Sequence, residues 1–241
     1  MSATKNYQDF DSIRLFTMID GIIVNETPLR VGIGRESVLG ATVDDAVYRV
    51  NQVPVIPGSS LKGSFRQLAE SMVKASGDKP IHDPWDLDAI KKEVKGGKFC
   101  TICATFGNTY LASHVKIFDA TPVNPERVRT FTKTGVAIDR EFGGARPGLL
   151  YTEEFIAPGN QWNFRMEVIN IRIFREADQS DERATILRSI LEILMDPGIY
   201  IGARKSVGCG LIKLKEAKWR VYGLRFGGLS LEDEGEVRKH V

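Results

Sequence analysis

Two glycine-containing segments carry basic side chains at spacings that suit anion binding. The first, IPGSSLKGSFR, spans residues 56–66 and places Lys62 four residues before Arg66. Ser59 or Ser60 has the residue type of a helix N-cap. Both cations are then expected on one face near the helix start, where free N–H groups and the helix dipole attract a phosphate. A capped surface helix with two solvated cations fits the same residues, so this segment alone leaves both interpretations open.

The second segment, GARKSVGCG, spans residues 202–210 and links a predicted helix to the last predicted strand. Backbone N–H groups in such a turn can form an anion-binding concavity. Its candidate phosphate contacts are Arg204, Lys205, Ser206, Gly208 and Gly210. A tight turn with glycine at positive φ explains the same pattern without a ligand. Neither segment matches a nucleotide-binding fingerprint, because the first lacks Gly-Lys-Ser/Thr and the second follows a helix.

Cys100 and Cys103 form a single C-x-x-C pair, which supplies half of a zinc site. His82, in IHDPWD, is the natural third ligand, and a zinc ion there would hold a glycine-rich segment in shape. Two partly buried thiols without metal fit the same residues equally well. The fourth ligand is not evident from the sequence, and the alternatives are Cys209, Asp83 and His114.

Hydrophobic periodicity predicts six core elements that position these residues. In chain order they are strand 13–24, helix 59–75, strand 114–119, strand 162–174, helix 181–195 and strand 211–222. This order is the ferredoxin-like (RRM-like) arrangement of an α+β domain. The apolar pattern shifts frame near Val168 and Ile169, which indicates either a bulge or a strand buried on both faces.

Three excursions interrupt this core. Residues 25–57 are predicted to be a long loop with a short hairpin inside it. Residues 77–112 are predicted to be an insertion with little regular structure, and residues 121–150 a flexible arm. The charged tail, LEDEGEVRKHV, is predicted to be frayed. The chain is thus interpreted as one domain, residues 1–241, with insertions at 77–112 and 121–150.

Four motifs in chain order resemble the RAMP superfamily of CRISPR-associated proteins, and more narrowly the backbone subunit of type III (Csm/Cmr-type) effector complexes. Each motif alone is weak, but four in order are specific, and the resemblance runs from about residue 13 to residue 222. The motifs are IPGSSLKGSFR (56–66), CTICATFG (100–107), TGVAIDREFGGARPGLLYTEEFIAPGNQWNF (134–164) and YIGARKSVGCGLIKL (200–214).

This resemblance implies a subunit that stacks with copies of itself, or with paralogues, into a filament along a CRISPR guide RNA. Large and small type III effector subunits are then further partners. The segment around residues 134–164 would be a thumb-like hairpin that pushes through the guide–target duplex at regular intervals. The residues expected to hold RNA are Ser60, Lys62, Arg66, Arg140, Arg204, Lys205, Ser206, Gly208 and Gly210.

The family also cleaves target RNA with an aspartate that lies shortly before the PGSSLKG motif. Here VDDAVYRV occupies that place, with Asp44 the better match and Asp45 the reserve. A carboxylate at a bent RNA step can hold a hydrated Mg²⁺ or accept the proton of a ribose 2′-OH. From the residues alone, a solvated pair of loop aspartates is the more common explanation.

The basic arm adds a second set of candidate RNA contacts. Phe131 and Phe142 lie among its cations, and this mixture suits splayed bases and phosphates. A solvated arm with ordinary charges is the alternative. The cations are Arg127, Arg129, Lys133, Arg140 and Arg146.

Composition restricts the class of protein without naming a function. The chain has 33 Lys and Arg against 31 Asp and Glu, a net charge of +2, 42% hydrophobic and 27% charged residues, all ordinary for a globular protein. Three cysteines are too few for a disulfide scaffold. No apolar stretch approaches a membrane span and the first residues lack a signal-peptide core, so a cytoplasmic protein without a membrane partner is predicted.

Three functions therefore remain open. The first is a metal-dependent endoribonuclease acting within the complex, the second a non-catalytic RNA-binding subunit of the same complex. The third is a stand-alone ribonuclease that processes guide RNA, which needs a histidine-centred site. Such a site has only His82 and His114 to draw on, because His240 lies in the tail.

Overall fold

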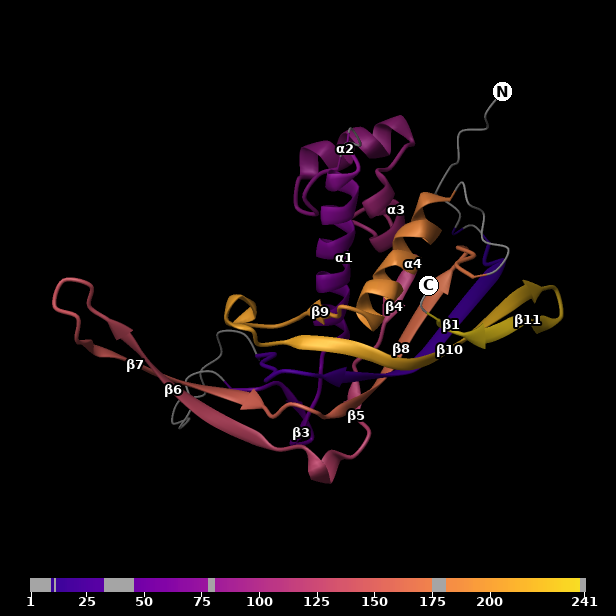
Figure 1. The fold of residues 1–241 in the computed structure, drawn as a ribbon. Coiled ribbons are helices and arrows are strands. Elements are labelled where there is room, and N and C mark those ends of the chain that lie inside the picture. The colour runs from indigo at the N-terminus through magenta and orange to yellow at the C-terminus, as the bar shows by residue number, and fades with distance from the viewer. Residues whose placement is uncertain (1–9, 11, 33–45, 78–80, 175–180, 239–241) are drawn as a thin grey trace.

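The computed structural model describes residues 10, 12–32, 46–77, 81–174 and 181–238. Its main element is a twisted antiparallel sheet with the strand order β11-β10-β1-β8-β4 (Figure 1). Short strands extend it, since β5 pairs with β8 and β9 pairs with β10. The strands are β1 (Leu15–Asn25), β4 (Val115–Ile117), β5 (Thr121–Pro122), β8 (Gln161–Ile169), β9 (Ile199–Tyr200), β10 (Leu211–Arg225) and β11 (Gly228–Glu236).

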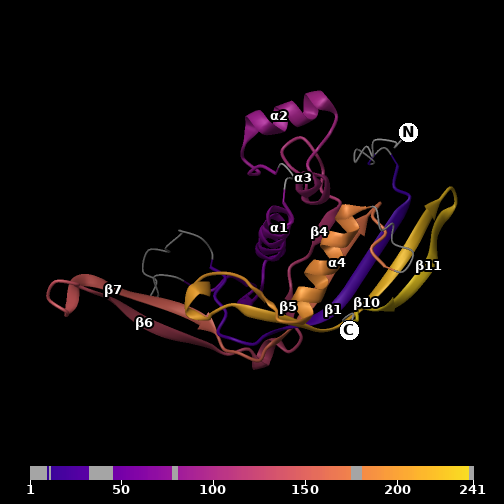
Figure 2. The same cartoon turned by 45° about the horizontal axis from the view of Figure 1, so that its top comes forward.

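Helices α1 (Gly58–Ala75) and α4 (Glu182–Met195) cover one face of this sheet (Figures 1 and 2). Apolar side chains recur along each helix at helical spacing and are buried against the strands. Phe65 of α1, for example, packs on Phe164 of β8, with ring centroids 6.3 Å apart. The predicted mixture of helices and antiparallel strands is confirmed. No helix in the described part of the chain is long and apolar enough to cross a membrane.

The first helix begins at Gly58, one residue before the predicted range of 59–75. Pro57 occupies the N-cap position without a side-chain hydrogen bond, so neither Ser59 nor Ser60 caps the helix. The backbone N–H of Gly58 instead donates to the carboxylate of Asp119, at 2.8 Å. A side-chain carbon at Gly58 would lie 2.2 Å from the carbonyl oxygen of Ile117. Glycine therefore lets the helix start press against the end of β4, where a carboxylate satisfies its first N–H.

The insertion at 77–112 is more regular than predicted. It contains α2 (Leu87–Gly96), which lies beyond the end of α1 far from the sheet (Figure 2), and α3 (Thr101–Phe106), which packs beside α1 and α4. Asp86 caps α2 by accepting from the N–H of Ala89, and Gly97 ends it with a φ of 61°. Only Ile90 of α2 is buried. The amphipathic pattern of α2 is short and is surrounded by glycines and prolines, so the sequence did not predict a helix there.

The basic arm forms a long β-hairpin. After the short turn η1 (Pro125–Arg127), β6 (Thr130–Ile138) pairs with β7 (Ala145–Ile156), and the hairpin projects from one end of the sheet (Figure 1). The strands pair from Thr130 opposite Ile156 to Ile138 opposite Ala145, with one register shift after Val136, so a hairpin replaces the loose arm that was predicted. The predicted short hairpin inside residues 25–57 is confirmed as β2 (Arg49–Val50) with β3 (Val53–Pro54).

Two strand ends differ from the prediction. Strand β8 stops at Ile169, because Asn170 takes a positive φ of 56°, rather than continuing to residue 174. Its last four residues, Met166 to Ile169, are all buried, so the frame shift reflects burial on both faces. In the described part of the tail, residues 231–236 are not frayed, since they belong to β11 (Gly228–Glu236), which pairs with β10. The carboxylates of this edge strand are mostly exposed.

Removal of the tertiary cap should loosen the start of α1. We expect Asp119→Ala to lower the free energy of unfolding by about 1 kcal/mol, the usual effect of losing a side-chain cap. Asp119→Asn keeps an acceptor oxygen and should retain most of the stability. Urea unfolding followed by circular dichroism measures both. Equal losses in the two variants would mean that the hydrogen bond to Gly58 does not stabilise the helix.

Candidate functional site

The two basic residues of the first segment point to different places. Lys62 is half-buried and makes no hydrogen bond or ion pair within the described residues. Burial, with the nearby charge of Arg66, lowers the pKa of Lys62. The guanidinium of Arg66 turns instead toward the insertion, where it contacts Glu70, Gly107 and Cys103. Lys62 is therefore available for an anion, whereas Arg66 is occupied by protein groups.

The glycine-rich loop 202–210 is held by its backbone. Gly210 has a φ of 89°, and a side-chain carbon there would lie 2.0 Å from the carbonyl oxygen of Ile201. Its N–H donates to the carbonyl of Pro28, and the N–H of Ala203 donates to the carbonyl of Arg30. Residues Lys205–Val207 form the short turn η2. The loop thus packs on the chain that follows β1, and Lys205, Ser206 and Val207 remain exposed.

One hollow joins the two glycine-containing segments. The amine of Lys205 donates to the side-chain oxygen of Gln67 on α1, at 3.4 Å. A cavity of about 300 Å³ beside this contact is lined by Ser64 and Lys205 among other residues. Lys62 and Arg204 are not among its lining residues. Ser64 and Lys205 therefore share one hollow, and Lys62 lies elsewhere on α1.

Arg204 is an anchor for this loop rather than a free cation. Its Nε and Nη2 atoms donate to the carboxylate of Glu153, both at 2.9 Å, and its guanidinium stacks 5.1 Å from the ring centre of Tyr151. Arg30 pairs with the same carboxylate from the other side. Glu153 is 5% exposed, so two cations compensate one buried charge. The base of the hairpin is thereby tied to the glycine-rich loop.

The neighbouring Glu154 holds a different segment. Its carboxylate accepts from both terminal nitrogens of Arg49, one at 2.8 Å, and from the N–H of Val47 at 3.1 Å. The hydrogen bonds from Arg49 lower the pKa of Glu154 to about 2 against the opposing effect of burial. Asp44 and Asp45 lie outside the described residues, just before this tether.

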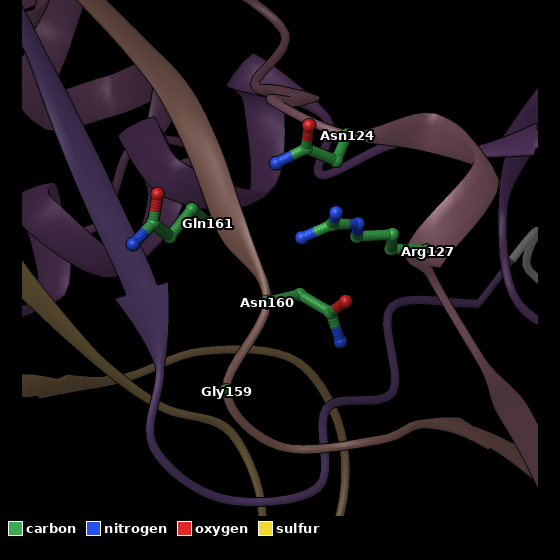
Figure 3. Close-up of a pocket in the computed structure, with 5 residues that line it drawn as sticks. All are labelled: Asn124, Arg127, Gly159, Asn160 and Gln161. Atoms are coloured by element: carbon green, nitrogen blue, oxygen red, sulfur yellow. The ribbon is translucent and has the colours of Figure 1, made fainter.

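The hairpin exposes apolar and basic side chains together. Phe142 is 87% exposed and Leu150 is 69% exposed, and Arg140 lies beside Phe142 at the turn. A polar hollow of about 270 Å³ lies at its base, where Arg127 faces Asn124 and Asn160 (Figure 3). The two amides were not among the sequence candidates, because asparagine has no distinctive spacing.

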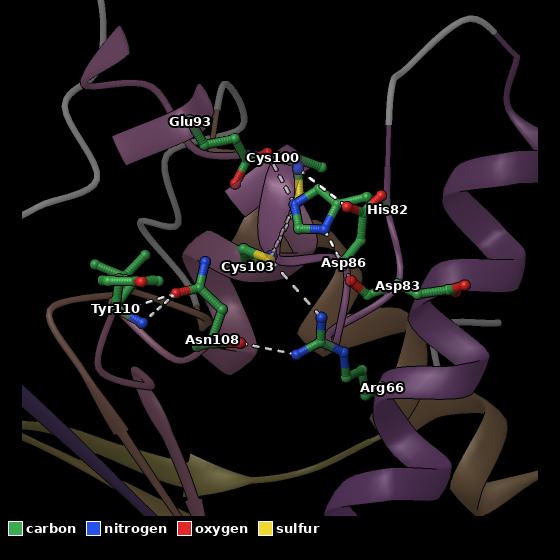
Figure 4. Close-up of polar contacts among 12 residues, drawn as sticks. Arg66, His82, Asp83, Asp86, Glu93, Cys100, Cys103, Asn108 and Tyr110 are labelled. Carbon is green, nitrogen blue, oxygen red and sulfur yellow. Dashed lines mark hydrogen bonds and ion pairs between the residues drawn. The ribbon is translucent and has the colours of Figure 1, made fainter. Parts of the chain in front are cut away.

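The cysteine pair belongs to a four-residue donor cluster. One donor atom from each of His82, Glu93, Cys100 and Cys103 lies within 4.8 Å of all the others (Figure 4). The Nε2 atom of His82 is 3.7 Å from Cys100 Sγ, 3.6 Å from Cys103 Sγ and 3.1 Å from Glu93 Oε1. A tetrahedral zinc ion with its usual bond lengths separates nitrogen and sulfur ligands by about 3.5 Å. The donor spacing therefore fits zinc.

The orientation of His82 and one of the two thiols also suit a cation. Against the effect of burial, however, hydrogen bonds with Asp83 and Glu93 raise the pKa of the His82 ring, so that a metal ion would have to displace its proton. The other ring nitrogen of His82 lies 2.9 Å from the carbonyl oxygen of Asp83, which leaves Nε2 facing the cluster. The hydrogen bond with Cys100 is the main factor that lowers the pKa of Cys103 to about 6, although burial opposes it. The same interaction raises the pKa of Cys100. One thiolate is thus favoured near neutral pH before any ion binds.

Glu93 is the cluster member that sequence reasoning missed. It lies on α2, seven residues before Cys100, and also accepts from the N–H of Cys100. None of the suggested fourth ligands belongs to the cluster in the described part of the chain. His114, for example, is fully buried, with Nδ1 2.7 Å from the carbonyl oxygen of Ile169 and Nε2 3.3 Å from Arg183. Glu93 could have been identified only by predicting α2, because that helix brings its carboxylate to the cysteines.

Comparison with known proteins defines the class of this chain. The model of the RAMP superfamily matches residues 23–213, which is most of the sequence. The chain therefore belongs to the RAMP superfamily, and the sequence resemblance is confirmed at that level.

Two curated relatives carry the same name, "CRISPR system Cms endoribonuclease Csm3". The protein from Methanocaldococcus jannaschii is 28% identical over 225 residues, covering 83% of this chain and 79% of the relative. That from Methanothermobacter thermautotrophicus is 25% identical over 235 residues, covering 84% and 85%.

A solved structure has a similar fold. It is a chain in the cryo-EM structure of the Type III-B Cmr-beta bound to cognate target RNA, with a TM-score of 0.54 and 19% identity. The match covers 85% of this chain and 60% of that chain, so this chain spans little more than half of its length.

The ion pair of Glu154 predicts how stability depends on pH. Its pKa lies at about 2 in the folded chain against an ordinary 4.5, so its contribution is complete above 4.5 and is lost as the pH falls toward 2. The difference in unfolding free energy between wild type and Glu154→Gln should be largest at neutral pH and shrink over that window. Chemical denaturation at a series of pH values measures it.

Glu126→Gln is the matched control, because Glu126 is exposed and its carboxylate has no partner within the described residues. Its effect on stability should be small at every pH. A Glu154→Gln deficit that stays constant down to the acid limit would show that the ion pair with Arg49 is not its source.

Proposed function

We propose that this chain is a guide-RNA-binding backbone subunit of a type III CRISPR effector complex, and that it cleaves complementary target RNA at regular intervals. Membership in the RAMP superfamily and two relatives named as Csm3 endoribonucleases support this. The observation that carries it within this molecule is the meeting of Lys205 with the polar side of α1 at one exposed hollow. A cation, hydroxyls and a backbone turn are the groups that bind an RNA backbone.

The guide RNA would run past the glycine-rich loop and the start of α1. Lys62 and Lys205 are the cations proposed to meet its phosphates, with Ser60, Ser206, Gly208 and Gly210 close to the same path. Lys62 supports this path because it has no protein partner within the described residues. Gly208 supports it because no atom lies within 4 Å of the place where a Cβ would be, so the backbone there is open to a ligand. Arg204 would contribute through loop shape, since its guanidinium already binds Glu153.

The β6–β7 hairpin is proposed to act as the thumb of the subunit. Its exposed Phe142 and Leu150 suit contact with an unstacked base pair, and Arg140 suits the adjacent phosphate. The strand order β10-β1-β8-β4 supports a ferredoxin-like core within a single domain, from which this hairpin departs. Copies of the chain, or paralogues, would repeat the thumb along the guide, together with large and small effector subunits in the cytoplasm.

Cleavage is proposed to use Asp44, or Asp45 next to it. A base displaced by the thumb lets a ribose 2′-oxygen align with the following phosphorus. The carboxylate accepts the 2′-OH proton, the new O–P bond forms and the bond to the 5′-oxygen breaks. The leaving 5′-oxygen takes a proton from water, so the products are a 2′,3′-cyclic phosphate and a 5′-hydroxyl. A hydrated Mg²⁺ or similar ion, when bound, would supply charge stabilisation. The tether from Glu154 to Val47 and Arg49 supports a fixed position for the end of this loop.

The cysteine cluster is proposed to hold a structural zinc ion. His82, Cys100 and Cys103 would be ligands as the sequence suggested, and Glu93 would complete the set. A bound zinc would join α2, α3 and the coil segment before α2 that carries His82. Its role would be to hold the insertion together, since all four positions are taken by protein atoms.

A histidine-centred ribonuclease is less well supported. His82 faces the cysteine cluster, and His114 is buried between Ile169 and Arg183. Neither described histidine is placed to exchange a proton with RNA at the surface. The non-catalytic alternative within the same complex is distinguished by the following experiment.

Target-RNA cleavage by the assembled complex tests the proposal. Labelled RNA complementary to the guide should be cut in Mg²⁺ into a ladder of regular spacing, and a chelator should abolish it. Asp44→Ala should reduce cutting by at least about 100-fold, the lower range for losing a proton-transfer group, without weakening target binding. Gel analysis gives the ladder, and filter binding gives the affinity.

Asp45→Ala is the matched control, one residue away, and should leave the ladder in place. A ladder that survives Asp44→Ala but not Asp45→Ala would exchange the two assignments. Target binding without any cutting by the wild type would reject the nuclease proposal and leave an RNA-binding subunit. Cutting of free repeat RNA by the isolated chain without metal would favour the histidine mechanism instead.

A further inference from the structure

Every nitrogen of the Arg66 guanidinium is occupied by a protein acceptor. Nε donates to Glu70 at 2.9 Å, Nη1 to the carbonyl oxygen of Gly107 at 2.8 Å, and Nη2 lies 3.7 Å from Cys103 Sγ. The side chain is only 14% exposed. An RNA phosphate would have to compete with a carboxylate, a carbonyl and a sulfur for a guanidinium whose three nitrogens each already have a protein acceptor. Arg66 is therefore poorly suited to the phosphate contact that its sequence position indicated.

These contacts join three parts of the chain. Arg66 and Glu70 lie on consecutive turns of α1, Gly107 follows the last residue of α3, and Cys103 lies within α3 and is fully buried. Figure 4 shows the guanidinium beneath the cluster, opposite His82 and Glu93. Apart from His82, no other basic side chain in the described part of the chain contacts either cysteine sulfur. Arg66 is thus a polar link between α1 and the insertion that carries the cysteine cluster.

We propose that Arg66 is a positioning residue for the cysteine cluster: its guanidinium donates to Cys103 Sγ and fixes α3 against α1, so that the cluster binds a metal ion tightly. This inference rests on the zinc site proposed above and not on RNA binding or cleavage. An N–H donor to a ligating sulfur lowers the electron density on that sulfur and fixes its direction. Outer contacts of this kind change metal affinity by about 10–100-fold when they are removed.

The geometry distinguishes arginine from lysine at this position. A planar guanidinium reaches three acceptors in three directions at once, whereas a lysine ammonium on a flexible stem cannot hold the same fork. Arg66→Lys should therefore keep the positive charge near the cluster and lose the joint contact with Gly107 and Cys103. Arg66→Gln removes the charge as well. The two variants separate the effect of charge from the effect of position.

Cobalt substitution provides a direct readout of the cluster. The full-length chain is stripped of metal and titrated with Co²⁺ in competition with a chelator, and the thiolate-to-cobalt absorption band is recorded. We expect Arg66→Gln to weaken Co²⁺ binding by about 10–100-fold and to shift this band, with Arg66→Lys between it and wild type. Lys74→Gln is the matched control, because Lys74 is an exposed cation in the last turn of the same helix. It should change neither quantity.

Binding of single-stranded RNA to the same preparations completes the test. Lys62→Gln should weaken RNA binding, and Arg66→Lys should leave it near wild type while Co²⁺ is bound. The inference is overturned if Arg66→Gln and Arg66→Lys retain the wild-type cobalt affinity and band, or if their only defect is a loss of RNA affinity equal to that of Lys62→Gln. Failure of the wild type to bind Co²⁺ or Zn²⁺ overturns it together with the zinc site, and leaves the RNA-binding proposal standing.

Discussion

The adjacent carboxylates Glu153 and Glu154, near the base of the hairpin, are the constraint on which the candidate interface depends. Successive residues of a strand point to opposite faces, so one strand can hold two segments at once. Glu153 binds Arg204 of the glycine-rich loop, and Glu154 binds Arg49 beside the aspartate-bearing segment. Both carboxylates are nearly buried, and a buried charge that loses its partner is costly. The hairpin, the loop and the tether are therefore held in one relative arrangement.

The arginines and lysines of the predicted RNA site have divided roles. Arg66 and Arg204 both bind glutamates, while Lys62 has no protein partner within the described residues and Lys205 meets only a neutral amide. The physical reason is the guanidinium, whose planar fork matches carboxylates and carbonyls, whereas a lysine ammonium stays hydrated and mobile. Around the two glycine-containing segments, these two arginines shape the surface and the two lysines supply its accessible charge. Residue spacing alone treats both as equivalent cations, so it could not separate them.

What the sequence could predict depended on local pattern. The buried faces of α1 and α4 follow from apolar residues three and four apart, and their positions agree with the structure. The start of α1 could not be predicted in the same way, because its cap is Asp119, sixty-one residues away. Glu93 could not be predicted as a member of the cysteine cluster, because its helix is short and mostly exposed and therefore has only a weak apolar pattern. The positions of Asp44 and Asp45 rest on resemblance alone.

The edge strand β11 is acidic, whereas the hairpin at the other end of the sheet is basic. Strand β11 carries Glu232, Asp233, Glu234 and Glu236 and no basic residue, a charge of −4, at the opposite end of the sheet from the hairpin (Figure 1). Residues 125–150 carry five basic and three acidic side chains, a charge of +2. Arg172, Arg225 and Arg238 pair with some of the β11 carboxylates and offset part of this difference. A polyanion would still be attracted to the hairpin end more than to the β11 edge, so the charge pattern favours one orientation before contact.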